Sequence, residues 1–126
     1  MKRIHESKSA PAPVGPYSQA VEVDGMLYCS GQISINPKTN GVFTGDIKEQ
    51  AKMVMDNIGA VLIAADLDYS AIIKTTIFLT SMSDFAAVNE VYSKYFKGQY
   101  PARSTIAVAA LPKGVNVEIE VIAKRG

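Results

Sequence analysis

The amino-acid sequence predicts an α+β fold in which two helices cover one face of a sheet of about five or six strands. The prediction rests on a β-hairpin signal near the start, on two segments with the apolar spacing of amphipathic helices, and on later segments rich in β-branched residues. These segments follow one another as hairpin, helix, strand, helix, strand, strand. Two helices can cover only one face of such a sheet, so its other face must meet solvent or another chain.

The hairpin lies between residues 21 and 29. Asp24-Gly25 tolerates positive φ at both central positions of a two-residue turn, and apolar residues stand on both sides of it. Prolines between residues 10 and 16 forbid helix and favour extended chain, so we expect an ordered loop before the hairpin. The turn formers of residues 36–41 separate the hairpin from the first helix.

Two later segments have helical periodicity. In the first, apolar residues recur every three or four positions, at Ile47, Ala51, Val54, Ile58, Leu62 and Ala65. Asp46 and Glu49 are spaced as a capping box at its start. The second helix opens at Ser83-Asp84, carries Phe85, Val88, Tyr92 and Tyr95, and is expected to end at Gly98.

The remaining strands are predicted from β-branched and aromatic residues. They span Ile72 to Thr80, Ser104 to Ala109 and Val117 to Ala123, and Leu111 to Gly114 has the composition of a turn between the last two.

Side chains alternate between the two faces of a strand, which predicts the faces of the sheet. In the last strand Val117, Ile119, Val121 and Ala123 should pack on the helices, and Glu118, Glu120 and Ile122 should point the other way. Packing Ile106 and Val108 on the helices turns Arg103, Thr105 and Ala107 toward Glu118. We therefore expect Arg103, Glu118 and Ser30 to share the helix-free face. With Phe78 and Ile122 on that face, it is a poor solvent surface and predicts a homo-oligomer.

Length and composition restrict the class of protein. The 126 residues fit one domain over residues 1–126, and the single cysteine, Cys29, fits a reducing compartment. A net charge of +1 gives no general field that would attract nucleic acid. The longest apolar run, residues 59–65, is far shorter than the ~20 residues that span a bilayer. The N-terminal segment lacks the apolar region of a secretory signal, so we expect a cytoplasmic protein.

The residue types also bear on cofactors. One histidine and one cysteine cannot supply the clusters that zinc or iron sites require, so we expect no metal. No glycine-rich phosphate loop precedes either helix, and we expect no nucleotide cofactor. His5, the only imidazole, is the only histidine base available to Cys29 or Ser30, which disfavours covalent catalysis.

Five residues remain as candidates for substrate binding or catalysis without a metal, a nucleotide or a covalent intermediate, and each has a purely structural alternative. Arg103 can bind a carboxylate bidentately, or it can pair with Glu118 or Glu120 across the sheet. Glu118 can hold or activate a water, or it can be a solvated carboxylate on a strand face. Tyr17, Ser30 and Gly31 can line a pocket, although core packing and close strand packing explain them equally well.

Several short motifs resemble those of the Rid family of reactive intermediate deaminases, also called YjgF-type proteins, and in particular its RidA branch. They are Pro101-Ala102-Arg103-Ser104, Leu111-Pro112, Val117-Glu118-Ile119-Glu120, Gly15-Pro16-Tyr17-Ser18-Gln19 and Ser30-Gly31-Gln32. The resemblance covers nearly the whole chain. It implies a chorismate-mutase-like α+β fold of the bacillus type, with one mixed sheet of about six strands. It also implies a homotrimer whose sheets form a central β-barrel, with an active site in each subunit interface.

The resemblance implies hydrolysis of enamines and imines, such as 2-aminoacrylate and 2-aminocrotonate, to 2-keto acids and ammonia. Pyridoxal-phosphate (PLP) dependent serine and threonine dehydratases would supply these substrates, and no cofactor would be needed. Arg103 would hold the substrate carboxylate and Glu118 would position or activate the water. Tyr17, Ser30 and Gly31 would line the pocket, with Asn89 as a neighbour. Main-chain groups of Thr105, where many bacterial relatives have cysteine, would contact the substrate.

Two other functions are weighed against deamination. A keto-acid binding or regulatory module would use the same Arg103 without turnover. Ribonuclease activity or translation inhibition, which some relatives are said to have, is disfavoured by the near-neutral charge and the single histidine.

Overall fold

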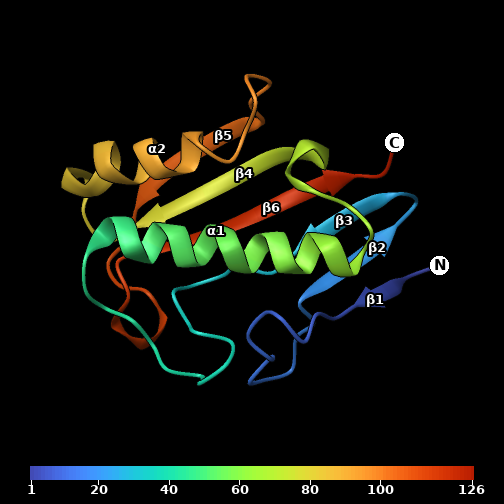
Figure 1. The fold of residues 1–126 in the computed structure, drawn as a ribbon, viewed down its shortest axis with the longest axis horizontal. Coiled ribbons are helices and arrows are strands. Elements are labelled where there is room, and N and C mark those ends of the chain that lie inside the picture. The colour runs from blue at the N-terminus through green and yellow to red at the C-terminus, as the bar shows by residue number, and fades with distance from the viewer.

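The computed structural model describes residues 1–126 as a six-stranded mixed sheet with both α-helices on one face (Figure 1). This is the predicted fold class. The strand order is β1-β2-β3-β6-β4-β5. The strands are β1 (Arg3–His5), β2 (Ala20–Val23), β3 (Met26–Cys29), β4 (Ile72–Leu79), β5 (Ala102–Ala107) and β6 (Val117–Lys124), and the helices are α1 (Ile47–Ala64) and α2 (Phe85–Ser93).

The predicted hairpin is confirmed as β2 and β3. Asp24 and Gly25 have φ of 52° and 79°, so both central positions of the turn are left-handed, as a two-residue hairpin with this twist requires. Ala20 pairs with Cys29 and Val23 with Met26. β3 then pairs with β6, which joins the hairpin to the centre of the sheet.

The first helix is also confirmed. α1 begins at Ile47, and the Asp46 carboxylate accepts a hydrogen bond from the Glu49 backbone nitrogen at 3.1 Å. Its apolar side lies over the sheet and forms most of the helical part of the core. None of the helices combines the length and the apolar character needed to cross a membrane.

The second helix is shorter than the sequence predicts. It ends at Ser93, and Tyr95 and Phe96 lie beyond it, where their rings pack with that of Tyr69. This packing explains the early end, because the chain leaves the helix axis to bring both rings onto Tyr69. Gly98, with φ of 92°, marks a later turn.

The unit β4–α2–β5 contains the parallel pair of strands. β4 pairs with β5 in parallel and with β6 in antiparallel orientation, so α2 is the crossover between parallel neighbours. β5 starts two residues earlier than predicted and lies at an edge of the sheet.

The predicted orientation of β5 is wrong. Arg103 pairs with Thr75 and Thr105 with Ile77, and both β4 partners are buried under the helices. Arg103 and Thr105 therefore face α2, while Ile106 is 47% exposed on the opposite face. The prediction assumed that the aliphatic residues of this strand must enter the core. At this edge the sheet is covered by a helix that carries a polar residue, Asn89, so the core-facing side of β5 is not aliphatic.

The face of β6 is predicted correctly. Val117, Ile119, Val121 and Ala123 are all buried, and Glu118 and Ile122 lie on the helix-free face with Phe78, the partner of Glu118 across β4. Tyr28 of β3 is 48% exposed. The helix-free face thus carries aromatic and aliphatic side chains that nothing in this chain covers.

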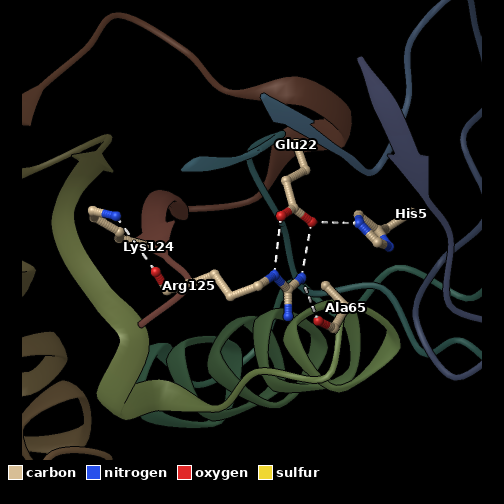
Figure 2. A network of polar contacts seen from close by, with 5 residues as sticks. All are labelled: His5, Glu22, Ala65, Lys124 and Arg125. Atoms are coloured by element: carbon tan, nitrogen blue, oxygen red, sulfur yellow. Dashed lines mark hydrogen bonds and ion pairs between the residues drawn. The ribbon is translucent and has the colours of Figure 1, made fainter. Parts of the chain in front are cut away.

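A partly buried charged network joins the two ends of the chain (Figure 2). Glu22 of β2, whose side chain is 8% exposed, accepts two hydrogen bonds from Arg125 at 2.8 and 3.0 Å and contacts Nε2 of His5 at 2.8 Å. Arg125 also donates to the carbonyl of Ala65 at 2.8 Å. One carboxylate therefore holds β1, the C-terminus and the end of α1 together. The hydrogen bonds from Arg125, and then from His5, lower the pKa of Glu22 from 4.5 to about 2.

The network predicts acid-sensitive stability. Because the folded state lowers the pKa of Glu22, its contribution is complete above pH 4.5 and is lost as the pH falls toward 2. Glu22→Gln should lower the free energy of unfolding near neutral pH and flatten its pH dependence in that window. Chemical denaturation at a series of pH values checks this. Glu6→Gln, at an exposed position just after β1, is the control, and an equal change in both variants would contradict the assignment.

Candidate active site

A cavity of about 380 Å³ lies on the helix-free side, at the junction of the proline-rich loop, the end of β3 and the start of β6. Of the predicted site residues it gathers Tyr17, Ser30, Gly31 and Glu118. Its other walls are Pro11, Ala12, Val14, Gln32, Ile33, Ile35, Pro112 and Lys113.

The carboxylate of Glu118 lies directly against the backbone of Gly31. A Cβ atom built on Gly31 would overlap Oε2 of Glu118 and stand 2.9 Å from its Cδ, so only glycine fits this position without moving the carboxylate. This close approach, left open by the sequence alone, explains the glycine.

Ser30 supports the wall that carries Tyr17. Its hydroxyl donates to the Ser18 carbonyl at 2.6 Å, and its backbone nitrogen donates to the Gln19 carbonyl at 2.9 Å. The loop of residues 15–19 is therefore tied to the end of β3. Tyr17, which is 50% exposed, stands at the mouth of the cavity rather than in the core.

Burial of the Glu118 side chain raises its pKa, and the nearby Glu120 carboxylate adds to the effect. Burial also means that the carboxylate is less hydrated than one on an open strand face. Such a group is a better proton acceptor than an ordinary glutamate once it is ionised.

Arg103 lies elsewhere, on the helix side of β5. Its Nη1 donates to Oδ1 of Asn89 at 2.6 Å, and its Cζ lies 5.5 and 5.3 Å from the ring centroids of Phe85 and Tyr92. Arg103 makes no ion pair within the chain; all of the ion pairs join other residues. The alternative in which Arg103 pairs with Glu118 or Glu120 across the sheet is therefore wrong for this chain.

A second cavity, of about 480 Å³, opens beside the guanidinium. It is lined by Asn89, Tyr92, Ser93, Tyr100, Pro101 and Arg103. The structure thus divides the predicted site residues into two groups on opposite faces of the sheet. Arg103 is in register with the buried Thr75, whereas Glu118 is in register with Phe78 on the other face.

Thr105 belongs to the Arg103 group. Its hydroxyl is the one buried side-chain polar atom without a hydrogen-bond partner. It lies in a small space shared with Phe85, Asn89 and Arg103. Because β5 is an edge strand, its outer edge offers main-chain groups that no other strand of this chain uses.

Sequence reasoning missed some walls of both cavities. Pro112 and Lys113 were expected only as a turn, yet they line the Glu118 cavity, and Lys113 has a left-handed φ of 57°. Phe85 and Tyr92 were expected as the apolar side of a helix. The polar Asn89 between them, at helical spacing from both, was the signal that this side meets something charged.

Neither the thiol nor the cavity beside Tyr69 belongs to these groups. Cys29 is buried, and burial raises its pKa to about 12. The cavity of about 500 Å³ around Tyr69, Tyr95 and Phe96 contains none of the predicted site residues.

Comparison with known proteins covers the full chain. The sequence model of the family described as Endoribonuclease L-PSP matches residues 7–125. The 2-iminobutanoate/2-iminopropanoate deaminase of Mus musculus is 45% identical over 100% of this chain and 93% of its own length. Protein DfrA of Myxococcus xanthus is 53% identical over 97% of this chain and 94% of its own length.

Solved structures agree with the sequence relatives. A protein of unknown function of the conserved Rid protein family, YyfA from Yersinia pestis, has a TM-score of 0.97 at 51% identity and covers 99% of this chain and 100% of its own. E. coli TdcF with bound serine has a TM-score of 0.94 at 42% identity, and the match covers 98% of this chain and 99% of the TdcF chain.

The contact between Gly31 and Glu118 predicts a specific effect of a methyl group. Gly31→Ala should push the carboxylate out of the cavity toward water and bring its pKa closer to 4.5, because burial is the main cause of the shift. NMR titration of the glutamate carboxyl carbons checks this, with Glu118→Gln to assign the resonance. Gly41→Ala, in an exposed turn, is the matched control. An unchanged Glu118 pKa in Gly31→Ala would contradict the geometry.

Proposed function

The chain belongs to the Rid family, in its RidA branch, and from this premise we propose that it is an enzyme that hydrolyses 2-imino acids to 2-keto acids and ammonia. The observation that carries the proposal is the similarity over the full chain to proteins named 2-iminobutanoate/2-iminopropanoate deaminase, from Mus musculus at 45% and Homo sapiens at 44% identity. The proposed substrates are the imine and enamine forms of 2-aminoacrylate and 2-aminocrotonate.

The reaction asks little of the protein. Water adds to the carbon of the C=N bond, the added oxygen loses a proton, and the nitrogen is protonated and leaves as ammonia while the C=O bond forms. Imines hydrolyse in water without a catalyst, so holding a small anion and one water in the correct geometry is a sufficient mechanism. The proposal therefore involves no metal and no cofactor.

In this proposal Arg103 binds the substrate carboxylate. Its contacts within the chain are a carboxamide oxygen and two aromatic rings, which leave its charge unneutralised. Main-chain groups of Thr105, on the outer edge of β5, contact the substrate beside it. Asn89 stands next to the guanidinium on α2.

Glu118 is proposed to orient the attacking water and to accept its proton. Its carboxylate lies in the cavity walled by Tyr17, Ser30 and Gly31, which would bind the rest of the substrate. A half-buried glutamate with a raised pKa suits proton transfer near neutral pH.

The separation of Arg103 from Glu118 supports a site shared between subunits. The two groups occupy different cavities on opposite sides of the sheet, and the helix-free face leaves Tyr28 and Ile106 about half exposed. We propose a homotrimer in which the helix-free faces form a central β-barrel. The Arg103 group of one chain then meets the Glu118 group of its neighbour.

The substrates point to a source. Such enamines are short-lived products of PLP-dependent serine and threonine dehydratases, and the proposed role is to remove them. A binding module without turnover is the second candidate, favoured by the bound serine in the structure of E. coli TdcF. Ribonuclease activity has less support, because His5, the only histidine, contacts Glu22 and lines neither cavity.

Arg103→Ala should abolish imine hydrolysis without unfolding the chain, because its guanidinium makes no ion pair that the fold needs. A coupled assay with a serine or threonine dehydratase measures this, with semicarbazide trapping the remaining imine. Arg3→Ala, an exposed arginine of β1, is the control. If trapping stays at the level set by spontaneous hydrolysis with both wild type and Arg103→Ala, the enzyme is rejected. Carboxylate binding without faster release of keto acid would favour the binding module.

Glu118→Gln tests the proposed role of Glu118 in orienting the attacking water and accepting its proton. Because burial raises the pKa of Glu118, the carboxylate form should be lost at a pH above the ordinary 4.5, and the rate should fall there on the acid side. The variant should lower kcat by roughly 100-fold, the usual scale of general base catalysis, and remove this acid limb. A pH–rate profile after subtraction of spontaneous hydrolysis checks it. An acid limb that persists in Glu118→Gln would assign the titration to another group.

A further inference from the structure

The side of α2 that faces β5 makes three contacts with one guanidinium. We infer that Phe85, Asn89 and Tyr92 are positioning residues that hold Arg103 in the orientation that receives a carboxylate. This set is called the α2 clamp below. The inference rests on the proposed function, since it concerns how the proposed substrate-binding arginine is held.

The clamp follows from helical spacing. Asn89 and Tyr92 come four and seven positions after Phe85, so all three side chains project from one side of the helix. The start of the helix is fixed by Ser81, whose hydroxyl accepts from the Ser83 backbone nitrogen at 3.2 Å in the turn just before it. The helix therefore presents a preformed surface to Arg103.

Tyr92 is held more firmly than a surface ring. It is 3% exposed, its hydroxyl lies 2.9 Å from that of Thr75 on β4, and its ring lies 4.9 Å from that of Phe96. Contacts to β4 and to the segment after α2 thus fix the ring on which the guanidinium lies. Aromatic faces attract a guanidinium, and a fixed ring limits where the charge can move.

All three members of the clamp are neutral. A glutamate or aspartate at position 89 would hold Arg103 as well, but it would neutralise the charge and compete with an incoming carboxylate. A carboxamide oxygen and two rings hold the group and leave its charge available. Oδ1 of Asn89 accepts from Nη1, so the other N–H donors of the guanidinium remain for a ligand.

This assigns Asn89 a role that differs from the one the family resemblance implies. It acts through Arg103 rather than as a neighbour of the substrate. Changes in the clamp should therefore weaken binding of any small 2-keto carboxylate and raise KM, with much less effect on kcat, because the groups that handle water belong to the Glu118 cavity.

The decisive variant is Asn89→Asp, which keeps size and replaces the neutral acceptor by a charge. Calorimetric binding of 2-oxobutanoate to the full chain should weaken roughly tenfold or more, because a carboxylate now occupies the guanidinium. Ala86→Asp places the same charge at an exposed position of α2 and should leave the affinity unchanged. Equal affinity in wild type and Asn89→Asp, while Arg103→Ala no longer binds, would overturn the inference.

A second pair of variants tests the rings. Phe85→Leu should raise KM roughly two- to fivefold at nearly constant kcat, the scale of a partly exposed cation–π contact. Phe85→Tyr keeps an aromatic ring and should therefore have the KM of wild type. NMR relaxation of the Arg103 Nε should show greater side-chain motion in Phe85→Leu than in wild type. Unchanged side-chain motion of Arg103 in Phe85→Leu, or a decrease in kcat with KM unchanged, would overturn the inference of the α2 clamp. Wild-type protein that neither binds 2-oxobutanoate nor hydrolyses imine would reject the proposed function instead, and the relaxation measurement would still decide whether the clamp exists.

Discussion

The strict alternation of side chains across a single sheet governs the rest of this structure. Both helices lie on one face, so every strand position is committed either to the core or to an uncovered surface. In β6 this places Glu118 on the uncovered face, and in β5 it places Arg103 under α2. No side-chain rotation brings the two together within one chain, because the sheet lies between them. The proposed chemistry therefore depends on a second copy as much as on any residue.

Each half of the proposed site is held in place by contacts within the chain, and the two halves are held differently. The Glu118 half relies on the absence of a side chain, because Gly31 gives the carboxylate its place, and on Ser30, which ties down the loop that carries Tyr17. The Arg103 half relies on neutral neighbours that fix a charge without cancelling it. Preorganisation of this kind lowers the reorganisation that binding and reaction would otherwise require. Outside both halves, the buried Glu22 holds the chain ends to the sheet.

The sequence allowed prediction of those parts of the fold that depend on local patterns. The Asp24-Gly25 turn, the capped start of α1 and the alternation of β6 each carry their signal within a few residues. The orientation of β5 could not be predicted in this way, because it depends on which helix covers an edge strand and on what that helix carries. The motifs predicted candidate site residues, but they could not predict the division of these residues between two faces or the partners of Arg103, because both are properties of packing between distant segments.

The chain's only thiol has a consequence for a protein proposed to meet reactive electrophiles. Cys29 is buried in the core, and burial raises the pKa of its thiol to about 12. Alkylating agents and peroxides react with thiolates, and this protein presents none to solvent. We therefore expect that thiol modification will not limit the working lifetime of the protein, and that this lifetime will not depend on a cellular reductant.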